Sequence, residues 1–161
     1  MRTATALALL GGLAVLTGCG GAGSAESTAP PVTVRAGGDE IEVDPTQYCL
    51  SGEGQRYQVT PPIIEVAPDT RIELRVPESV AEAGWGVQVF DEQLQEKIGD
   101  VDVARGAAEF DGITSSDVVP PTFYLVVVED ADTDECSGLS GAWPVGFIRA
   151  ATGTPTTAPA P

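Results

Sequence analysis

Apolar and polar residues alternate along most of the middle of this 161-residue chain, and this period of two limits its fold more than any other feature. In the segment RIELRV, residues 71–76, Ile72, Leu74 and Val76 share one side and the charged residues share the other. Successive side chains of a β-strand point to opposite faces of a sheet, so the pattern predicts a strand with one buried face. The segment WGVQVFD, residues 85–91, repeats the pattern.

Three further segments extend the β pattern. Residues 32–43 hold two alternating runs around a Gly-Gly turn, which predicts a hairpin. Residues 122–129, TFYLVVVE, are apolar on both faces and predict a central strand. Residues 142–149, AWPVGFIR, alternate as well, but Pro144 and Gly146 predict an edge position or a bulge.

Short strands separated by turns that contain Pro or Gly predict an all-β domain over residues 32–149. We expect a single antiparallel immunoglobulin-like β-sandwich, with one or two helical turns at residues 77–84. A small β-barrel is the alternative, because alternation alone does not distinguish a closed sheet from an open one. The Gly/Ala/Ser-rich tether 19–31 and the Pro/Thr/Ala-rich tail 150–161 are expected to be disordered.

Residues 1–18 have the composition of a secretory signal peptide. Arg2 is followed by an uncharged apolar stretch that ends in small residues, and this stretch is too short to span a bilayer. The exit, LTGC, resembles the bacterial lipobox, in which the cysteine is acylated and begins the mature chain. We therefore expect Cys19 to be a lipid anchor that holds the protein on the outer face of the cell membrane. An ordinary secreted protein with a cysteine near its cleavage site is the alternative.

Two cysteines remain in the mature chain, Cys49 and Cys136. A pair of cysteines outside the cytoplasm is typical of a disulfide. Two buried free thiols are the alternative.

Charge and composition exclude several functions. The chain has 8 basic and 24 acidic residues, a net charge of −16, so nucleic acid should repel it. It contains no histidine, which removes most zinc and copper sites and the usual serine and cysteine triads. We expect no cofactor and no enzymatic activity. Carboxylates are the one catalytic group left in quantity, so a carboxylate-dependent hydrolase is retained as an alternative.

The acidic run EDADTDE, residues 129–135, resembles the start of a calcium-binding loop. Asp130, Asp132 and Asp134 alternate as oxygen ligands do there, but Glu135 stands where an EF-hand loop needs glycine. A solvated acidic loop is the main interpretation, and a weak calcium site is the alternative.

Trp85 and Trp143 are the largest side chains of the domain. Tryptophans on alternating strands are usually part of the core, and an exposed surface for a partner is the alternative. Arg71 and Arg75 lie with Glu73 on the polar side of one strand, which indicates a set of cross-strand ion pairs.

Several segments together resemble a known family. They are the QYC segment at Gln47–Cys49, the VPESVAEAGWGVQV segment at Val76–Val89 and the GAWPVGFIR segment at Gly141–Arg149, combined with the N-terminal anchor. They resemble the actinobacterial lipoproteins of domain-of-unknown-function family 2771 (DUF2771) over most of residues 32–149. The resemblance implies a small membrane-anchored envelope protein and supplies no catalytic residues.

The sequence thus predicts a lipid-anchored cell-envelope protein that acts as a non-catalytic binding or interaction module. Its membrane contact would be the acylated Cys19, and its partner an envelope protein or a cell-wall component. A small-ligand or Ca²⁺-binding domain that uses the 129–135 loop is the first alternative.

Overall fold

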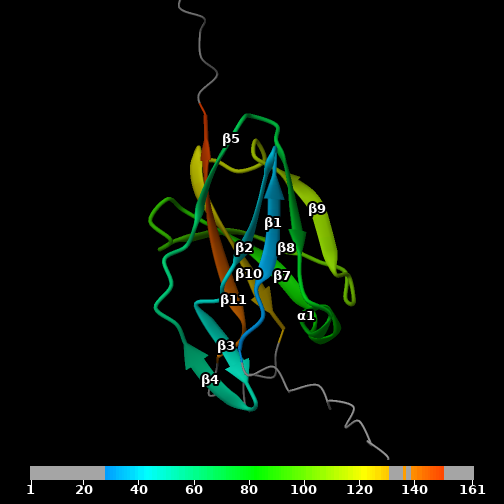
Figure 1. Ribbon diagram of the computed structural model, residues 1–161. Coiled ribbons are helices and arrows are strands. Elements are labelled where there is room, and N and C mark those ends of the chain that lie inside the picture. The colour runs from blue at the N-terminus through cyan, green and yellow to red at the C-terminus, as the bar shows by residue number, and fades with distance from the viewer. Residues whose placement is uncertain (1–27, 131–135, 137–138, 151–161) are drawn as a thin grey trace, which may run out of the picture.

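The computed structural model describes residues 28–130, 136 and 139–150. This part of the chain forms eleven strands and one short helix, arranged as two sheets that pack face to face (Figure 1). One sheet has the strand order β2-β1-β6-β9. The other has the order β4-β3-β11-β10-β7-β8, with β5 alongside β11. The predicted β-sandwich is confirmed.

The strands are β1 (Val32–Ala36), β2 (Asp39–Val43), β3 (Gln47–Leu50), β4 (Glu53–Arg56), β5 (Ile63–Val66), β6 (Arg71–Arg75), β7 (Trp85–Phe90), β8 (Lys97–Asp102), β9 (Glu109–Thr114), β10 (Thr122–Glu129) and β11 (Ala142–Arg149). The helix α1 (Glu78–Ala83) begins after Pro77 and ends at Gly84, as the sequence predicts. In the described ranges, no helix has the length and apolar character needed to cross a membrane.

The predicted hairpin is confirmed as β1 and β2, which pair antiparallel around Gly37 and Gly38. Strand β1 pairs on its other side with β6, and β6 pairs with β9. In the larger sheet β10 lies between β11 and β7, so the predicted central strand is confirmed as well. The three strands β11-β10-β7 face β1-β6-β9, which matches the C-F-G and A-B-E strands of an immunoglobulin-like sandwich.

Strand β11 is not the edge strand that Pro144 and Gly146 suggested. It pairs with β10 along one side, and on the other side with β3 at Ala142 and with β5 from Gly146 onward. The β5 pairing is parallel, the single departure from the antiparallel arrangement among the described strands. Pro144 falls between the two partners on that side, where a missing N–H costs no ladder hydrogen bond.

The core fills the space between the two sheets. Its largest fully buried side chains are Trp143, Phe123 and Phe147, and the two phenylalanine rings stack with their centroids 5.3 Å apart. The Trp143 Nε1–H donates a hydrogen bond of 2.9 Å to the Pro30 carbonyl. This bond fixes the chain just before β1 at the end of the sandwich where β11 begins, and the described chain leaves β11 at the opposite end (Figure 1).

Candidate functional site: two unlike sheet faces

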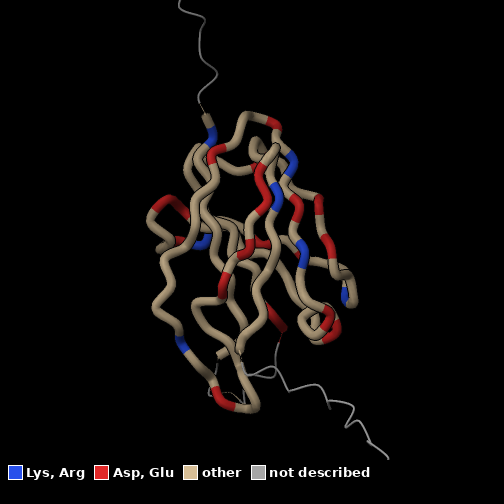
Figure 2. The backbone as a smooth tube through the Cα atoms, in the orientation of Figure 1, with Lys and Arg blue, Asp and Glu red and all other residues tan. Residues whose placement is uncertain are grey.

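The outward faces of the two sheets differ in chemistry. Figure 2 shows basic and acidic residues alternating over the four-stranded sheet, which lies at the front of that view. The outward face of the larger sheet is instead apolar over β10 and β11. We describe the first as the charged face and the second as the apolar face.

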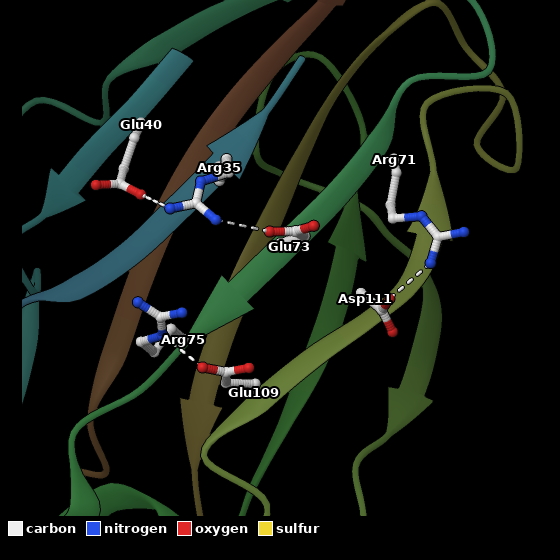
Figure 3. A network of polar contacts seen from close by, with 7 residues as sticks. All are labelled: Arg35, Glu40, Arg71, Glu73, Arg75, Glu109 and Asp111. Atoms are coloured by element: carbon white, nitrogen blue, oxygen red, sulfur yellow. Dashed lines mark hydrogen bonds and ion pairs between the residues drawn. The ribbon is translucent and has the colours of Figure 1, made fainter. Parts of the chain in front are cut away.

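Arginines and carboxylates pair across the strands of the charged face (Figure 3). Arg71 Nη1 lies 2.6 Å from Asp111 Oδ2, and Arg75 Nε lies 2.7 Å from Glu109 Oε1. Arg35 bonds to Glu40 and, at 3.2 Å, to Glu73. Alternation along β1 and β6 directs these side chains to the solvent side, as the sequence predicts for Arg71, Glu73 and Arg75.

These ion pairs are about half exposed, so they add little to stability individually. Hydrogen bonding and charge from Glu40, and then from Glu73, raise the pKa of Arg35 above its ordinary value. Arg35 therefore remains fully charged, and the pairs orient the guanidinium and carboxylate groups toward one another.

A groove of about 450 Å³ runs over the charged face. Arg35, Glu73, Arg75 and Glu109 line it, together with Phe110. Phe110 is partly exposed and also contacts the core. A Cβ added at Gly112 would lie 2.6 Å from the Phe110 ring, so the absence of a side chain there gives the ring room to lie along β9.

The apolar face is formed by those residues of β10 and β11 that do not enter the core. Phe123, Leu125 and Val127 point into the core, so the alternating residues between and beside them point outward. The outward apolar residues of the larger sheet are Ile63, Phe90, Tyr124, Val126, Val128, Pro144 and Ile148.

Strand register places these residues in rows across four strands. One row runs from Ile63 through Gly146 and Tyr124 to Phe90. A Cβ added at Gly146 would lie 2.8 Å from Tyr124 Cε1 and 3.1 Å from Ile63 Cγ1, so these two side chains converge over Gly146. The next row contains Pro144 and Val126. Ile63 is 55% exposed, so the row is open to solvent at β5.

Acidic residues lie at the margins of the apolar face. Glu65 follows Ile63 on β5, while Asp100 and Asp102 occupy the outward positions of β8 opposite Gln88 and Gly86. Lys97 pairs with Asp100 at 2.9 Å. Among the described residues, no lysine or arginine forms an ion pair with Glu65 or Asp102. The margin is therefore negative.

Both tryptophans lie in the core. Trp85 is 4% exposed and donates from Nε1 to the Ala107 carbonyl at 2.6 Å. Trp143 is fully buried and contacts the Tyr48 ring edge-on at a centroid distance of 5.8 Å. Phe90 and Tyr124, rather than the tryptophans, are the aromatic residues of the apolar face. The sequence contained a signal for Tyr124, because TFYLVVVE is apolar on both faces.

Three of the remaining sequence candidates, Cys49, Cys136 and Asp130, belong to the described residues. Cys49 on β3 is joined by a disulfide to Cys136, with the two Cα atoms 5.7 Å apart. The Asp130 N–H donates to the Gly84 carbonyl at 2.7 Å. Asp132, Asp134 and Cys19 lie outside the described residues. Within the described ranges, no three His, Cys, Asp or Glu side chains are grouped so that they could hold a metal ion.

Glu129 is the one buried carboxylate among the described residues, with 7% of it exposed. It stands opposite Trp85 in the register of β10 and β7. Burial raises the pKa of this carboxyl, and a hydrogen bond from the Gly141 backbone opposes that shift.

Comparison with known protein families identifies the family of this chain. The family model described as a protein of unknown function, DUF2771, matches residues 25–135, which is most of the chain. The chain belongs to this family. The DUF2771 match includes the QYC segment and the Val76–Val89 segment, and it ends before the disulfide partner Cys136 and strand β11. No curated protein and no solved structure matches the chain significantly.

Proposed function

We propose that this protein is a lipid-anchored, non-catalytic interaction module on the outer face of an actinobacterial cytoplasmic membrane, and that its apolar face binds a neighbouring envelope protein. The observation that carries the proposal is the two-sided character of β10. One side of this strand packs into the core. The other side is apolar as well: Val126 at its centre is 8% exposed, and Tyr124 and Val128 on either side of it are partly exposed.

Apolar residues that stay exposed on a sheet face, here Ile63 at 55% and Ile148 at 38%, are costly for a monomer in water. Scattered apolar residues are normal at a surface, but contiguous ones mark a contact surface. Tyr124, Ile63 and Phe90 are contiguous because they share one row of the sheet. Aromatic residues of this kind bury a large area on binding and lose little side-chain entropy.

Charge specifies the partner further. Glu65 and Asp102 flank the apolar centre, and the whole protein carries a net charge of −16. A second copy of this chain would bring like charges together, which disfavours self-association. A partner with an apolar patch and a basic margin would complement both features.

The position of the N-terminal segment agrees with a membrane-side attachment. Trp143 holds Pro30 at the end of the sandwich where β11 begins, so a tether from Cys19 would reach the domain at that end. A dozen residues of tether span on the order of 20 Å. The strands would then run away from the membrane, and the sheet faces would point parallel to it. The apolar face would in this way be presented to proteins in the same membrane.

A non-catalytic role is favoured by the chemistry of the carboxylates. The chain has no histidine, and Glu73, Glu109 and Asp111 are each bonded to an arginine. Acid–base catalysis needs two titratable groups that lie in one cleft and have different pKa values. Carboxylates that are each bonded to an arginine do not form such a pair with one another.

Site-specific photo-cross-linking in cells tests the proposal. A photoreactive residue replaces Tyr124 on the apolar face or, as the matched control, Glu42 on the other sheet. We expect one dominant cross-linked protein from position 124 and not from 42, and its loss in an Ile63→Asp background. Equal products from both positions, or a product with the chain's own residues 151–161, would overturn the proposal.

The anchor is tested separately. Cys19→Ala should release the protein from the membrane fraction and weaken the cross-link from position 124, because the partner shares the membrane. Retention of Cys19→Ala in the membrane would contradict the anchor.

A further inference from the structure

We propose that the groove over the charged face is a second binding site, and that it takes a neutral, polyhydroxylated ligand, namely a saccharide chain. This inference goes beyond the interaction function, because it concerns the other sheet and another class of ligand. It rests on the lining of the groove, its balance of charge and its aromatic wall.

The lining offers hydrogen-bond donors and acceptors side by side. The guanidinium groups of Arg35 and Arg75 supply donors, and the carboxylates of Glu73 and Glu109 supply acceptors. Each hydroxyl of a sugar ring both donates and accepts, and neighbouring hydroxyls lie at a spacing that planar two-pronged groups can match. An array of paired arginines and carboxylates therefore suits vicinal hydroxyls.

The ion pairs also fix the array before a ligand arrives. Arg75 is held by Glu109 at 2.7 Å, and Arg35 is held between Glu40 and Glu73. Long side chains that are already oriented lose less conformational entropy on binding. The same pairs that add little to stability would in this way contribute to recognition.

Charge balance argues against charged ligands. The two arginines of the lining face four carboxylates, those of Glu40, Glu73, Glu109 and Asp111. This surplus, with the net charge of −16, disfavours an anionic ligand. Each of the four carboxylates already bonds to an arginine, so a basic peptide would have to displace an existing partner at every contact.

The aromatic wall supplies the apolar contact that polar groups cannot. Phe110 lines the groove beside these charged groups, and the space at Gly112 accommodates its ring. A sugar ring has one face of C–H groups, which carry a slight positive charge and can pack on the electron-rich face of an aromatic ring. The volume, about 450 Å³, lies within the range of small-ligand sites.

Titration of the full-length acylated protein, purified in detergent, tests this site. The probes are uncharged tetrasaccharides of β-1,4-linked N-acetylglucosamine, of hexose and of pentose, with polygalacturonate and tetralysine as charged comparisons. Isothermal titration calorimetry gives the affinity, and saturation-transfer NMR gives the protons in contact. We expect at least one neutral tetrasaccharide to bind, and its ring C–H protons to show the strongest transfer.

Three variants locate the binding. Phe110→Ala and Glu109→Gln should each weaken binding at least tenfold. Glu109 is two-thirds exposed, so its substitution leaves folding intact even if the Phe110 variant is unstable. Lys97→Gln breaks an ion pair elsewhere on the surface and should leave the affinity unchanged within twofold.

Each remaining outcome overturns the proposal. These outcomes are binding of none of the neutral probes at millimolar concentration, binding of tetralysine or polygalacturonate alone, and saccharide binding that survives both groove substitutions. The cross-link from position 124 involves the opposite sheet and should be unchanged in Glu109→Gln. The saccharide site and the protein-binding face can therefore fail independently.

Discussion

Tyr124 and Ile63 converge over Gly146, although they lie on strands separated by more than fifty residues of sequence. A Cβ at Gly146 would approach both side chains more closely than ordinary contacts allow, at 2.8 Å and 3.1 Å. The parallel pairing of β5 with β11 brings Ile63 to this position. The absence of a side chain at Gly146 thus leaves the space into which Tyr124 and Ile63 converge.

Gly146→Ala should separate Tyr124 from Ile63, because the added methyl group occupies the space where they meet. Overpacking of this kind costs about 1–3 kcal/mol of unfolding free energy. Gly99→Ala is the matched control, since its Cβ would meet Val89 at an ordinary 3.7 Å and should change stability by less than about 0.5 kcal/mol. Urea denaturation measures both, and equal effects would contradict the close packing described for Gly146.

Replacing the disulfide should strongly destabilise the domain. The Cys49–Cys136 bond closes a loop of 87 residues, which restricts the unfolded chain. Loss of such a bond costs about 2–5 kcal/mol. The Cys49→Ser/Cys136→Ser double variant should therefore melt well below the oxidised protein and together with the reduced wild type. An oxidised protein that melts together with the double variant would show that this bond does not stabilise the fold.

Much of this fold could be predicted from local sequence patterns. Alternation in RIELRV and WGVQVFD identified buried residues such as Leu74 and Val87, because the period of side-chain direction is a property of the strand itself. The Gly-Gly turn identified the β1–β2 hairpin for the same reason, since a hairpin is local in sequence.

The location of β11 could not be predicted in this way. Pro144 and Gly146 are typical of sheet edges and of bulges, and local rules therefore predicted one or the other for this strand. The structure accommodates Pro144 between two partner strands, β3 and β5, an arrangement that depends on contacts far apart in sequence.

The candidate surfaces, too, combine features that local sequence predicts with features that depend on the tertiary fold. The ion pairs of Arg71 and Arg75 could be expected from their polar strand side, but their partners Asp111 and Glu109 lie on β9 and depend on sheet register. Tyr124 lay within a segment recognised as apolar on both faces. Its row with Ile63 and Phe90 again required the tertiary fold.

The Arg75–Glu109 pair should contribute little to stability. A double-mutant cycle with Arg75→Gln and Glu109→Gln should give a coupling of less than about 1 kcal/mol, because both side chains are more than half exposed. The coupling should fall further at high salt, where exposed charges are screened. A coupling well above this value would indicate that the pair stabilises the fold itself rather than orienting groups of the groove.

The charged carboxylate of Glu129 should make the wild-type protein less stable at neutral pH than the Glu129→Gln variant, which carries an uncharged amide there. Burial raises the pKa of this carboxyl above its ordinary value of 4.5, so the folded state binds its proton more tightly than the unfolded state does. The stabilisation from this group is complete below the ordinary pKa and is lost as the pH rises through the raised one. Glu129→Gln should therefore raise the unfolding free energy at pH 7 and have little effect in acid.

Asp117 provides a control of opposite sign. The Thr114 backbone N–H donates to its carboxylate at 2.7 Å and lowers its pKa below the ordinary value of 3.8. Its stabilisation is present above that value and is lost as the pH falls through the lowered pKa. Asp117→Asn should destabilise the protein at pH 7, with the difference shrinking in acid. Urea midpoints measured from pH 3 to pH 7 separate the two effects, and a Glu129→Gln variant less stable than wild type at pH 7 would show that Glu129 is stabilised in its charged form.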